Sequence, residues 1–304
     1  MALKLSFKSF LVPRDLGWNR TRAVCALPHC HNKLLMRYVP GSRAGIYVGE
    51  KWYCSPDCFA ADSRHILSSL SAGHVVEMPR NPRLSLGLAL LSKGHLTEDQ
   101  LRFATLQSHA SGESLETVLM ERGLVGEKQL AAARAVQWGY PVLAQDAGSQ
   151  IVESDLPPTL LREYSAVPVH YSVRAKRLVL GFVDRVDHGL LQAIEQITGF
   201  RAEPCFITPT DYGEQLQRIR RVEGYEEVAV DNPGEPAHMA RTLGGVAVEF
   251  GAGEASFSKC KSWVWARMLG KRGTVDVVFA LRNAQAARAG DFSTPLAELS
   301  EATG

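Results

Sequence analysis

Four cysteines near the start of the chain are the residues best placed to do chemistry. They come in two pairs, Cys25 with Cys30 and Cys54 with Cys58, while Cys205 and Cys260 stand alone. Zn²⁺ prefers four thiolate or imidazole ligands in a tetrahedron, and two short loops can each supply two thiolates. Four thiolates leave no open coordination position, so this pattern predicts a structural zinc ion and no catalysis at the metal.

Other interpretations of the cysteines stay open. Four and three residues separate the members of the two pairs, which is looser than the common spacing of two. His29 and His31 flank Cys30, so either imidazole could replace one thiolate. The four thiols could also be reduced and buried without metal, or form a redox pair.

The residues between and after the pairs predict the elements that must position the thiols. Ile46–Val48 are β-formers, Gly49 opens a tight turn, and the next residues pair back as a hairpin. Ser55 is a good N-cap with Pro56 at the first helical position, so Cys58 falls in the first turn, where the helix N-terminus favours a thiolate. A loop, a hairpin and a helix start follow each other as in a treble-clef zinc finger.

Composition and charge exclude several classes of protein. With 45% hydrophobic and 22% charged residues, the 304-residue chain is neither disordered throughout, collagen-like nor a coiled coil. No apolar run reaches the roughly 18 residues of a membrane helix. Met1–Arg14 contains no secretory cleavage site. We therefore expect a cytoplasmic protein without membrane insertion.

The first 80 residues are more basic than the rest of the chain. They hold 11 Lys and Arg against 5 Asp and Glu, a balance of +6, whereas the whole chain has a formal charge of +2. This balance allows nucleic-acid binding by a basic zinc module. The alternative, a solvated basic face, is favoured because no aromatic residues are interleaved with the cations.

The middle of the chain contains an internal repeat. Leu86, Gly94 and Leu101 recur 29 residues later as Leu115, Gly123 and Leu130. In each copy an apolar helix ends at a glycine suited to a left-handed cap, and Thr97 or Gly126 opens a second helix. Neither helix can bury its apolar stripe alone, so a small helical bundle is predicted.

These residues resemble a known family, the N-terminal domain of type II secretion and pilus assembly ATPases (the GspE N-terminal, or MshEN, class). The family has two 24-residue motifs with a five-residue spacer, of the form R-L-G-x-x-L-[LV]-x-x-G-[LI]-[LI]-x-x-x-x-L-x-x-x-L-x-x-Q. The matching stretches are residues 85–108 and 114–137 with the spacer 109–113, and the resemblance continues to about residue 220.

The resemblance implies that the paired motifs could bind cyclic di-GMP, through leucines that cover the guanines and through polar contacts. The implied ligand residues are Arg83, Leu86, Gly87, Leu90, Leu91, Gly94, Leu115, Val118, Leu119, Gly123 and Gln137. Ser85 and Ser114 stand at the two positions where the family motif has arginine. Arg83, two residues before Ser85, could substitute for the arginine of the first copy, and the second copy has no such substitute. Glu113 and Glu116 would place negative charge near a diphosphate. The alternative is a degenerate repeat kept as a protein-interaction scaffold.

The sequence contains no phosphate-binding G-x-x-x-x-G-K-[ST] loop, so we expect a stand-alone relative of the regulatory domain without a motor and without enzymatic activity. Taken with the resemblance, this predicts a bacterial adaptor that docks on a type II secretion or type IV pilus machine. The alternatives are a cyclic di-GMP receptor and nucleic-acid binding by the zinc module, of which the last is the least favoured.

The predicted fold is multidomain α+β. Its divisions are an N-terminal extension (1–23), a treble-clef-like zinc module (24–72), the helical repeat (80–145), an α/β subdomain (146–222), a linker (223–236), a small α+β domain (237–282) and a disordered tail (283–304).

Two features of the later segments bear on function. Asp187 follows a strand and precedes a helix, so we interpret it as an N-cap and not as a catalytic acid. Strand alternation puts Trp263, Trp265 and Arg267 on one face, which predicts either a partner-binding surface or packing against the helix of the same unit.

Overall fold

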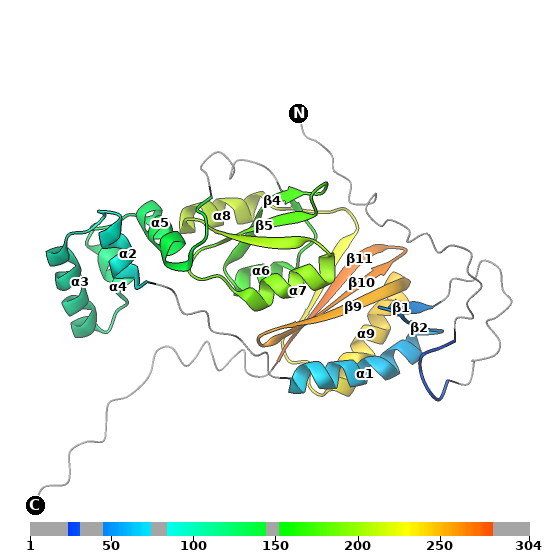
Figure 1. Cartoon of the computed structure of the whole chain (residues 1–304). Coiled ribbons are helices and arrows are strands. Elements are labelled where there is room, and N and C mark those ends of the chain that lie inside the picture. Colours follow the sequence, from blue (N-terminus) through cyan, green and yellow to red (C-terminus); the bar gives the residue numbers. More distant parts are fainter. Residues whose placement is uncertain (1–23, 31–44, 74–83, 144–151, 282–304) are drawn as a thin grey trace, which may run out of the picture.

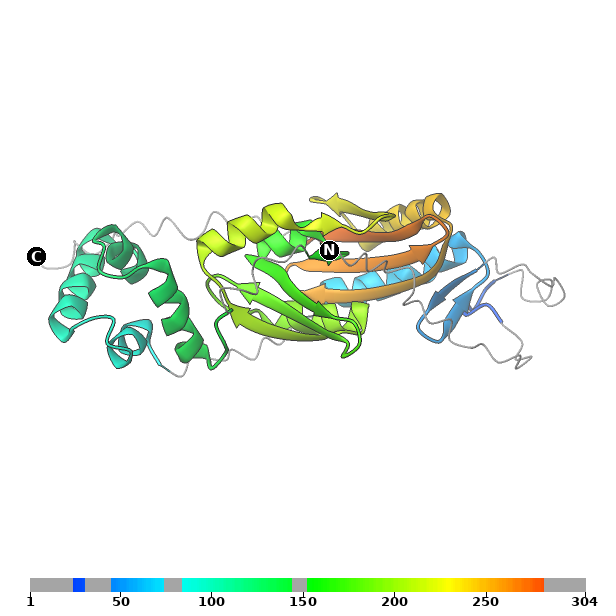
Figure 2. The same cartoon turned by 90° about the horizontal axis from the view of Figure 1, so that it is seen from above.

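The computed structural model describes residues 24–30, 45–73, 84–143 and 152–281 of the 304-residue chain. These residues form a mixed α+β structure, which confirms the predicted class. Figure 1 shows a six-stranded and a three-stranded sheet with helices between them, and Figure 2 shows the helical repeat and the cysteine segment at opposite ends of an elongated molecule. The predicted N-terminal extension and C-terminal tail lie outside the described residues.

The larger sheet joins strands from both ends of the chain. Its order is β2-β1-β9-β10-β11-β8. The strands are β1 (Ile46–Val48), β2 (Lys51–Tyr53), β8 (Tyr225–Val230), β9 (Ala252–Cys260), β10 (Trp263–Gly270) and β11 (Gly273–Ala280). Strand β1 lies parallel to β9, with Tyr47 opposite Glu254. The cysteine segment and the C-terminal unit, which the sequence analysis separated, therefore share one sheet.

Strand β8 lies within the segment that the sequence analysis treated as a linker. Residues 225–230 run parallel to β11, with Val228 opposite Val277. Val228 and Val230 pack against the apolar cluster under the sheet, and Tyr225 is buried. The linker prediction for 223–236 was wrong because the segment's Glu, Gly and Pro content masked a short strand whose partner lies about 50 residues further along the chain.

Two helices cover one face of the larger sheet. They are α1 (Pro56–Ala72) and α9 (Pro236–Phe250), which pack against each other and against β9–β11. A Cβ atom added at Gly244 would lie 3.1 Å from the Cβ of Ala60, so the small residue permits their close approach. Phe59, Leu243 and Val264 are fully buried in the resulting core.

The other face of the same sheet packs on the α/β subdomain. Trp263 and Trp265 contribute to one cluster with helices α6 (Pro158–Glu163) and α7 (His188–Thr198). The exposed fractions are 6% for Trp263 and 0% for Trp265, so the predicted exposed partner-binding surface is wrong. The two tryptophans do share one face, and that face is covered by helices of the preceding subdomain and not by α9.

The α/β subdomain has a three-stranded sheet of order β4-β5-β6, formed by Ala166–Ser172, Arg177–Phe182 and Arg201–Phe206. Helix α7 crosses from β5 to the parallel strand β6. Asp187 caps α7, since its Oδ1 accepts a 2.8 Å hydrogen bond from the Leu190 amide, as predicted. Helix α8 (Pro209–Arg218) packs on the far side of this sheet.

The helical repeat contains two helices per copy. They are α2 (Leu86–Ser92) and α3 (Glu98–Ser111), then α4 (Leu115–Glu121) and α5 (Glu127–Trp138). Each element of the second copy begins 29 residues after its equivalent in the first. Helix α2 packs mainly against α5, and α3 against α4, so each copy's first helix is completed by the other copy's second helix. Leu90 and Leu119 are fully buried in the shared core.

A buried ion pair connects the larger sheet to the α/β subdomain. The Arg267 guanidinium on β10 donates to both carboxylate oxygens of Asp276 on β11, at 2.8 and 2.7 Å. It also donates to Asp155 Oδ2 at 3.0 Å, just after β3 (Glu153–Ser154), which itself pairs with β7 (Arg220–Arg221). Arg267 and Asp276 are 5% and 0% exposed, so each needs the other's charge.

No helix among the described residues combines the length and the apolar character needed to cross a membrane.

Replacing Arg267 with Ala should lower the free energy of unfolding by about 3–5 kcal/mol, because Asp276 would be left buried without its counter-charge. Urea unfolding of the purified chain measures the change. Arg272→Ala is the matched control: its 3.6 Å ion pair with Glu249 is exposed, and its loss should cost less than about 1 kcal/mol. Equal effects of the two substitutions would contradict this account of the buried pair.

Candidate functional site

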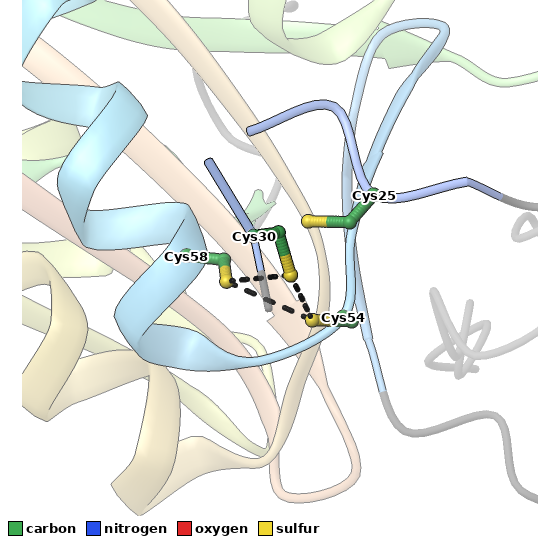
Figure 3. Close-up of side chains that lie close together, drawn as sticks. All are labelled: Cys25, Cys30, Cys54 and Cys58. Carbon is green, nitrogen blue, oxygen red and sulfur yellow. Dashed lines mark hydrogen bonds between the residues drawn. The ribbon is translucent and has the colours of Figure 1, made fainter. Parts of the chain in front are cut away.

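The four predicted metal ligands come together at the outer end of the larger sheet. The sulfur atoms of Cys25, Cys30, Cys54 and Cys58 all lie within 4.8 Å of one another. Figure 3 shows the four side chains pointing into one space between the loop, the end of β2 and the start of α1. The first three are buried and Cys58 is partly buried.

Local structure holds each sulfur in place. The loop of Cys25 and Cys30 is tied to strand β2, because the Ala26 amide donates to the Trp52 carbonyl at 2.8 Å. Cys54 follows β2 directly. Ser55 caps α1 as predicted, with its hydroxyl accepting from the Cys58 amide at 3.2 Å, which places Cys58 in the first helical turn.

The core beneath the cluster fixes the hairpin against the helix. Tyr53 is fully buried, and its ring meets Phe59 edge to face, with centroids 6.3 Å apart. The Tyr53 hydroxyl donates to Asp62 on α1. A Cβ atom at Gly45 would lie 2.2 Å from the Trp52 ring nitrogen, so only glycine lets Trp52 fold over the start of β1.

The separations between the sulfur atoms fit a tetrahedral metal site. Cys30 and Cys54 are 3.4 Å apart, Cys54 and Cys58 3.6 Å, and Cys30 and Cys58 3.7 Å. A tetrahedron with Zn–S bonds of about 2.3 Å has sulfur–sulfur edges of about 3.8 Å. The three separations among Cys30, Cys54 and Cys58 are close to that edge, and Cys25 completes a group of four sulfur atoms close enough to hold one metal ion.

Burial raises the pKa of two of these thiols. The pKa of Cys54 is raised, first by burial and then by hydrogen bonds with the neighbouring thiols. The pKa of Cys58 is also raised, because burial outweighs the hydrogen bond with Ser55. Burial therefore opposes ionisation of Cys58 more strongly than its hydrogen bond with Ser55 favours it.

The other candidate ligands do not join the cluster. His29 is exposed and is absent from the group of converging ligand atoms, while His31 lies outside the described residues. Cys205 and Cys260 are buried elsewhere, and burial raises the pKa of each thiol to about 12. Neither has the environment of a reactive thiolate.

The structure buries four of the ten described residues that the resemblance implies for cyclic di-GMP binding. Gly87, Leu90, Val118 and Leu119 are buried. Four others are partly buried: Leu86, Leu91, Leu115 and Gln137. The two turn glycines, Gly94 and Gly123, are exposed. Arg83 lies outside the described residues, so the structure does not place the shifted arginine.

The serines that replace the motif arginines have a local role. Ser85 caps α2 by accepting from the Leu88 amide at 3.3 Å, and Ser114 caps α4 by accepting from the Thr117 amide at 3.1 Å. Serine caps stabilise a helix by about 1 kcal/mol. Both serines therefore favour the two short helices, whatever the repeat binds.

One buried cation joins the repeat to the α/β subdomain, and the sequence analysis did not single it out. Arg134 on α5 is 6% exposed, and it donates to the Val183 carbonyl at 2.8 Å. Its guanidinium also pairs with Glu116 on α4 and, at 3.0 Å, with Asp184. The sequence contains one indication that Arg134 is buried: it interrupts the run Ala131-Ala-Ala-Arg134-Ala, and such an alanine-rich stretch is typical of a buried helix face.

A pocket of about 240 Å³ lies beside Arg134, between α4, α5 and the α/β subdomain. Three carboxylates and one guanidinium line it, from Glu116, Glu127, Asp184 and Arg134. An anionic diphosphate would meet net negative charge here. This part of the repeat therefore does not offer a phosphate site.

The basic segment of the first 80 residues is only partly described. Nine of its eleven cations lie outside the described residues, and the other two are Lys51 and Arg64. Lys51 lies 3.8 Å from the Asp62 carboxylate. The described residues thus provide no cationic surface for a nucleic acid around the cysteines.

The middle of the chain is similar to known proteins. Residues 138–226 match the MshEN domain family. The type IV pilus assembly ATPase PilB of Thermus thermophilus is 28% identical over 154 residues, which is 50% of this chain and 17% of PilB. The chain thus spans about a sixth of the length of this curated relative.

Solved structures of two further proteins are each similar to just under half of the chain. The structure of MshE with cdg is 23% identical, with a TM-score of 0.38, and covers 45% of this chain and 100% of its own. The N-terminal domain of XpsE is 23% identical, with a TM-score of 0.33, and covers 44% of this chain and 92% of its own.

The family match confirms the resemblance predicted from the sequence. The matched residues begin at the end of α5 and run through the α/β subdomain into β8, so they follow the helical repeat.

Proposed function

We propose, starting from the MshEN domain at residues 138–226, that this chain is a non-catalytic regulatory or adaptor protein of a type II secretion or type IV pilus machine. The domain match carries this proposal. PilB, the curated relative, is a pilus assembly ATPase, and the chain contains no phosphate-binding loop of the kind an ATPase needs. Its six cysteines are all free, which suits the reducing bacterial cytoplasm.

The packing of the MshEN domain supports an adaptor. Its helices α6 and α7 are buried against Trp263 and Trp265 of the larger sheet, so the domain is built into a second body. That second body also carries the cysteine cluster, through the pairing of β1 with β9. A domain of the secretion-ATPase type fixed to a second body in this way is suited to joining a machine to another component.

Affinity purification tests the adaptor role directly. The full chain, carrying a tag and cross-linked in cells that assemble the machine, should enrich components of that secretion or pilus machine over a tagged cytoplasmic protein of similar size. Mass spectrometry of the eluate provides the measurement. Enrichment no greater than in the control would contradict the proposal.

Cyclic di-GMP binding is the second candidate function, and one observation favours it. Gly94 and Gly123 both adopt left-handed backbone conformations, with φ of 68° and 64°, so the two motif turns keep the same shape.

Calorimetric titration with cyclic di-GMP distinguishes the receptor from the adaptor. If the chain is a receptor, titration with micromolar cyclic di-GMP should give a binding heat, and Arg83→Ala should abolish that heat. If it is only an adaptor, no binding is expected at about 100 µM ligand, because each missing charged hydrogen bond to phosphate weakens binding by about 1.5–3 kcal/mol.

We infer that Cys25, Cys30, Cys54 and Cys58 hold a structural Zn²⁺. The four sulfur donors lie within 4.8 Å of one another, and those of Cys30, Cys54 and Cys58 are 3.4–3.7 Å apart, which supports the assignment. When bound, the ion supplies the positive charge that keeps the buried thiols ionised, and it joins the loop, the hairpin and the helix. The four side chains themselves act only as ligands.

Protein purified without chelator should contain about one zinc ion per chain, as measured by inductively coupled plasma mass spectrometry. Cys54→Ala should reduce the content to well under one and lower the thermal midpoint, because the site would lose a buried ligand. Cys205→Ser is the control, since it removes a buried thiol far from the cluster and should keep the metal. Unchanged zinc content in Cys54→Ala would refute the assignment.

A further inference from the structure

Helix α3 carries an apolar stripe that nothing among the described residues covers. Phe103 is 55% exposed and Leu106 is 66% exposed, although both are large apolar side chains. With the exposed residues Asp99 and Ala110 they recur at intervals of four, three and four residues, so all four lie along one side of the helix. We call these four residues the α3 seam.

The opposite side of α3 already has its partner. Ala104 is fully buried in the bundle core, and Leu101 packs against the same core. Figure 1 shows α3 at the outer end of the repeat, away from both sheets. The α3 seam therefore faces outward from the molecule.

The internal repeat shows that this side of the helix is one that packs on protein. The residue equivalent to Leu106 in the second copy is Ala135 on α5, 29 positions later. Ala135 is only 7% exposed, because α5 packs there on the α/β subdomain. At the equivalent positions the first copy has larger apolar residues, Phe103 and Leu106. No described residue packs over these two side chains.

We propose that the α3 seam pairs with the α3 seam of a second copy of this chain, as two antiparallel helices about a two-fold axis. A two-fold axis between Phe103 and Leu106 puts Phe103 of one copy on Leu106 of the other. It also puts Asp99 against Ala110, next to His109 in the last turn of the second copy's helix. An isologous contact of this kind requires a self-complementary surface, which the seam provides.

The charge pattern selects the antiparallel arrangement. A parallel pair would place Asp99 opposite Asp99 within the seam, where two like charges repel as they lose water. The antiparallel pair separates the two carboxylates by the length of the seam. A contact between two 14-residue helices is smaller than a standard interface, so the dimer should be weak, with a dissociation constant on the order of 10–100 µM.

Sedimentation equilibrium of the full chain tests the pairing. Between about 5 and 300 µM, the weight-average mass should rise from the 33.3 kDa of one chain toward twice that value, since mass action populates a weak dimer over this range. Leu106→Glu should weaken association at least about tenfold, because it introduces a charge opposite Phe103. Val248→Glu is the matched control, because Val248 is a 65% exposed valine on α9, outside the seam, and its change should leave association unaltered.

A double variant tests the direction of the helices. In Phe103→Lys with Leu106→Glu, an antiparallel pair brings each lysine opposite a glutamate, so association should recover relative to Leu106→Glu alone. A parallel pair would bring lysine opposite lysine and give no recovery. Circular dichroism of each variant should match the parent chain, since both side chains are exposed.

A chain that stays monomeric to about 300 µM, or that associates equally well as Leu106→Glu, would overturn the proposal. In the first case the seam would have to bind a different protein. Association without recovery in the double variant would contradict the antiparallel arrangement.

Discussion

The structure depends on the requirement that both faces of one six-stranded sheet be covered. Strand β10 alternates between the two: Val264, Ala266 and Met268 face α1 and α9, whereas Trp263 and Trp265 face α6 and α7. A strand that is apolar on both sides must be buried on both sides. One face of this sheet therefore holds the helix that begins at the second cysteine pair, and the other face holds the MshEN domain. The hydrogen bonds of Arg267 with Asp276 and Asp155 add a charged contact between the sheet and the MshEN domain.

The cysteine cluster lies beside the shortest strands of this sheet. Strands β1 and β2 contain three residues each, and a hairpin of that length is marginal alone. Pairing with β9 provides one support, and the packing of Tyr53 on Phe59 provides another. A zinc ion held by Cys25, Cys30, Cys54 and Cys58 would supply the third, since its ligands come from the loop before the hairpin, the end of β2 and the start of α1. If the site holds zinc, metal binding and the pairing of β1 with β9 should therefore depend on each other.

Local rules predicted much of the molecule from the sequence. The caps at Ser55, Thr97 and Asp187 are hydrogen bonds within three residues, so residue type and spacing were sufficient to find them. The cysteine pairs were recognisable for the same reason, and the MshEN resemblance followed from motif spacing. The parallel pairing of β1 with β9 could not be read from the sequence, because it joins residues about 200 positions apart. Strand β8 and the buried Arg134 were missed because only their distant partners distinguish them from a linker and from a surface cation.

Hydrogen–deuterium exchange of the zinc-loaded chain, with and without a chelator, tests most directly whether the metal centre completes the shared sheet. The account predicts that chelation speeds exchange in β1 and in the amides of β9 that face it, while α8, in the α/β subdomain, stays protected. Unchanged protection of β1 and β9 after complete removal of the metal would contradict it, because the cysteine cluster would then not support the sheet.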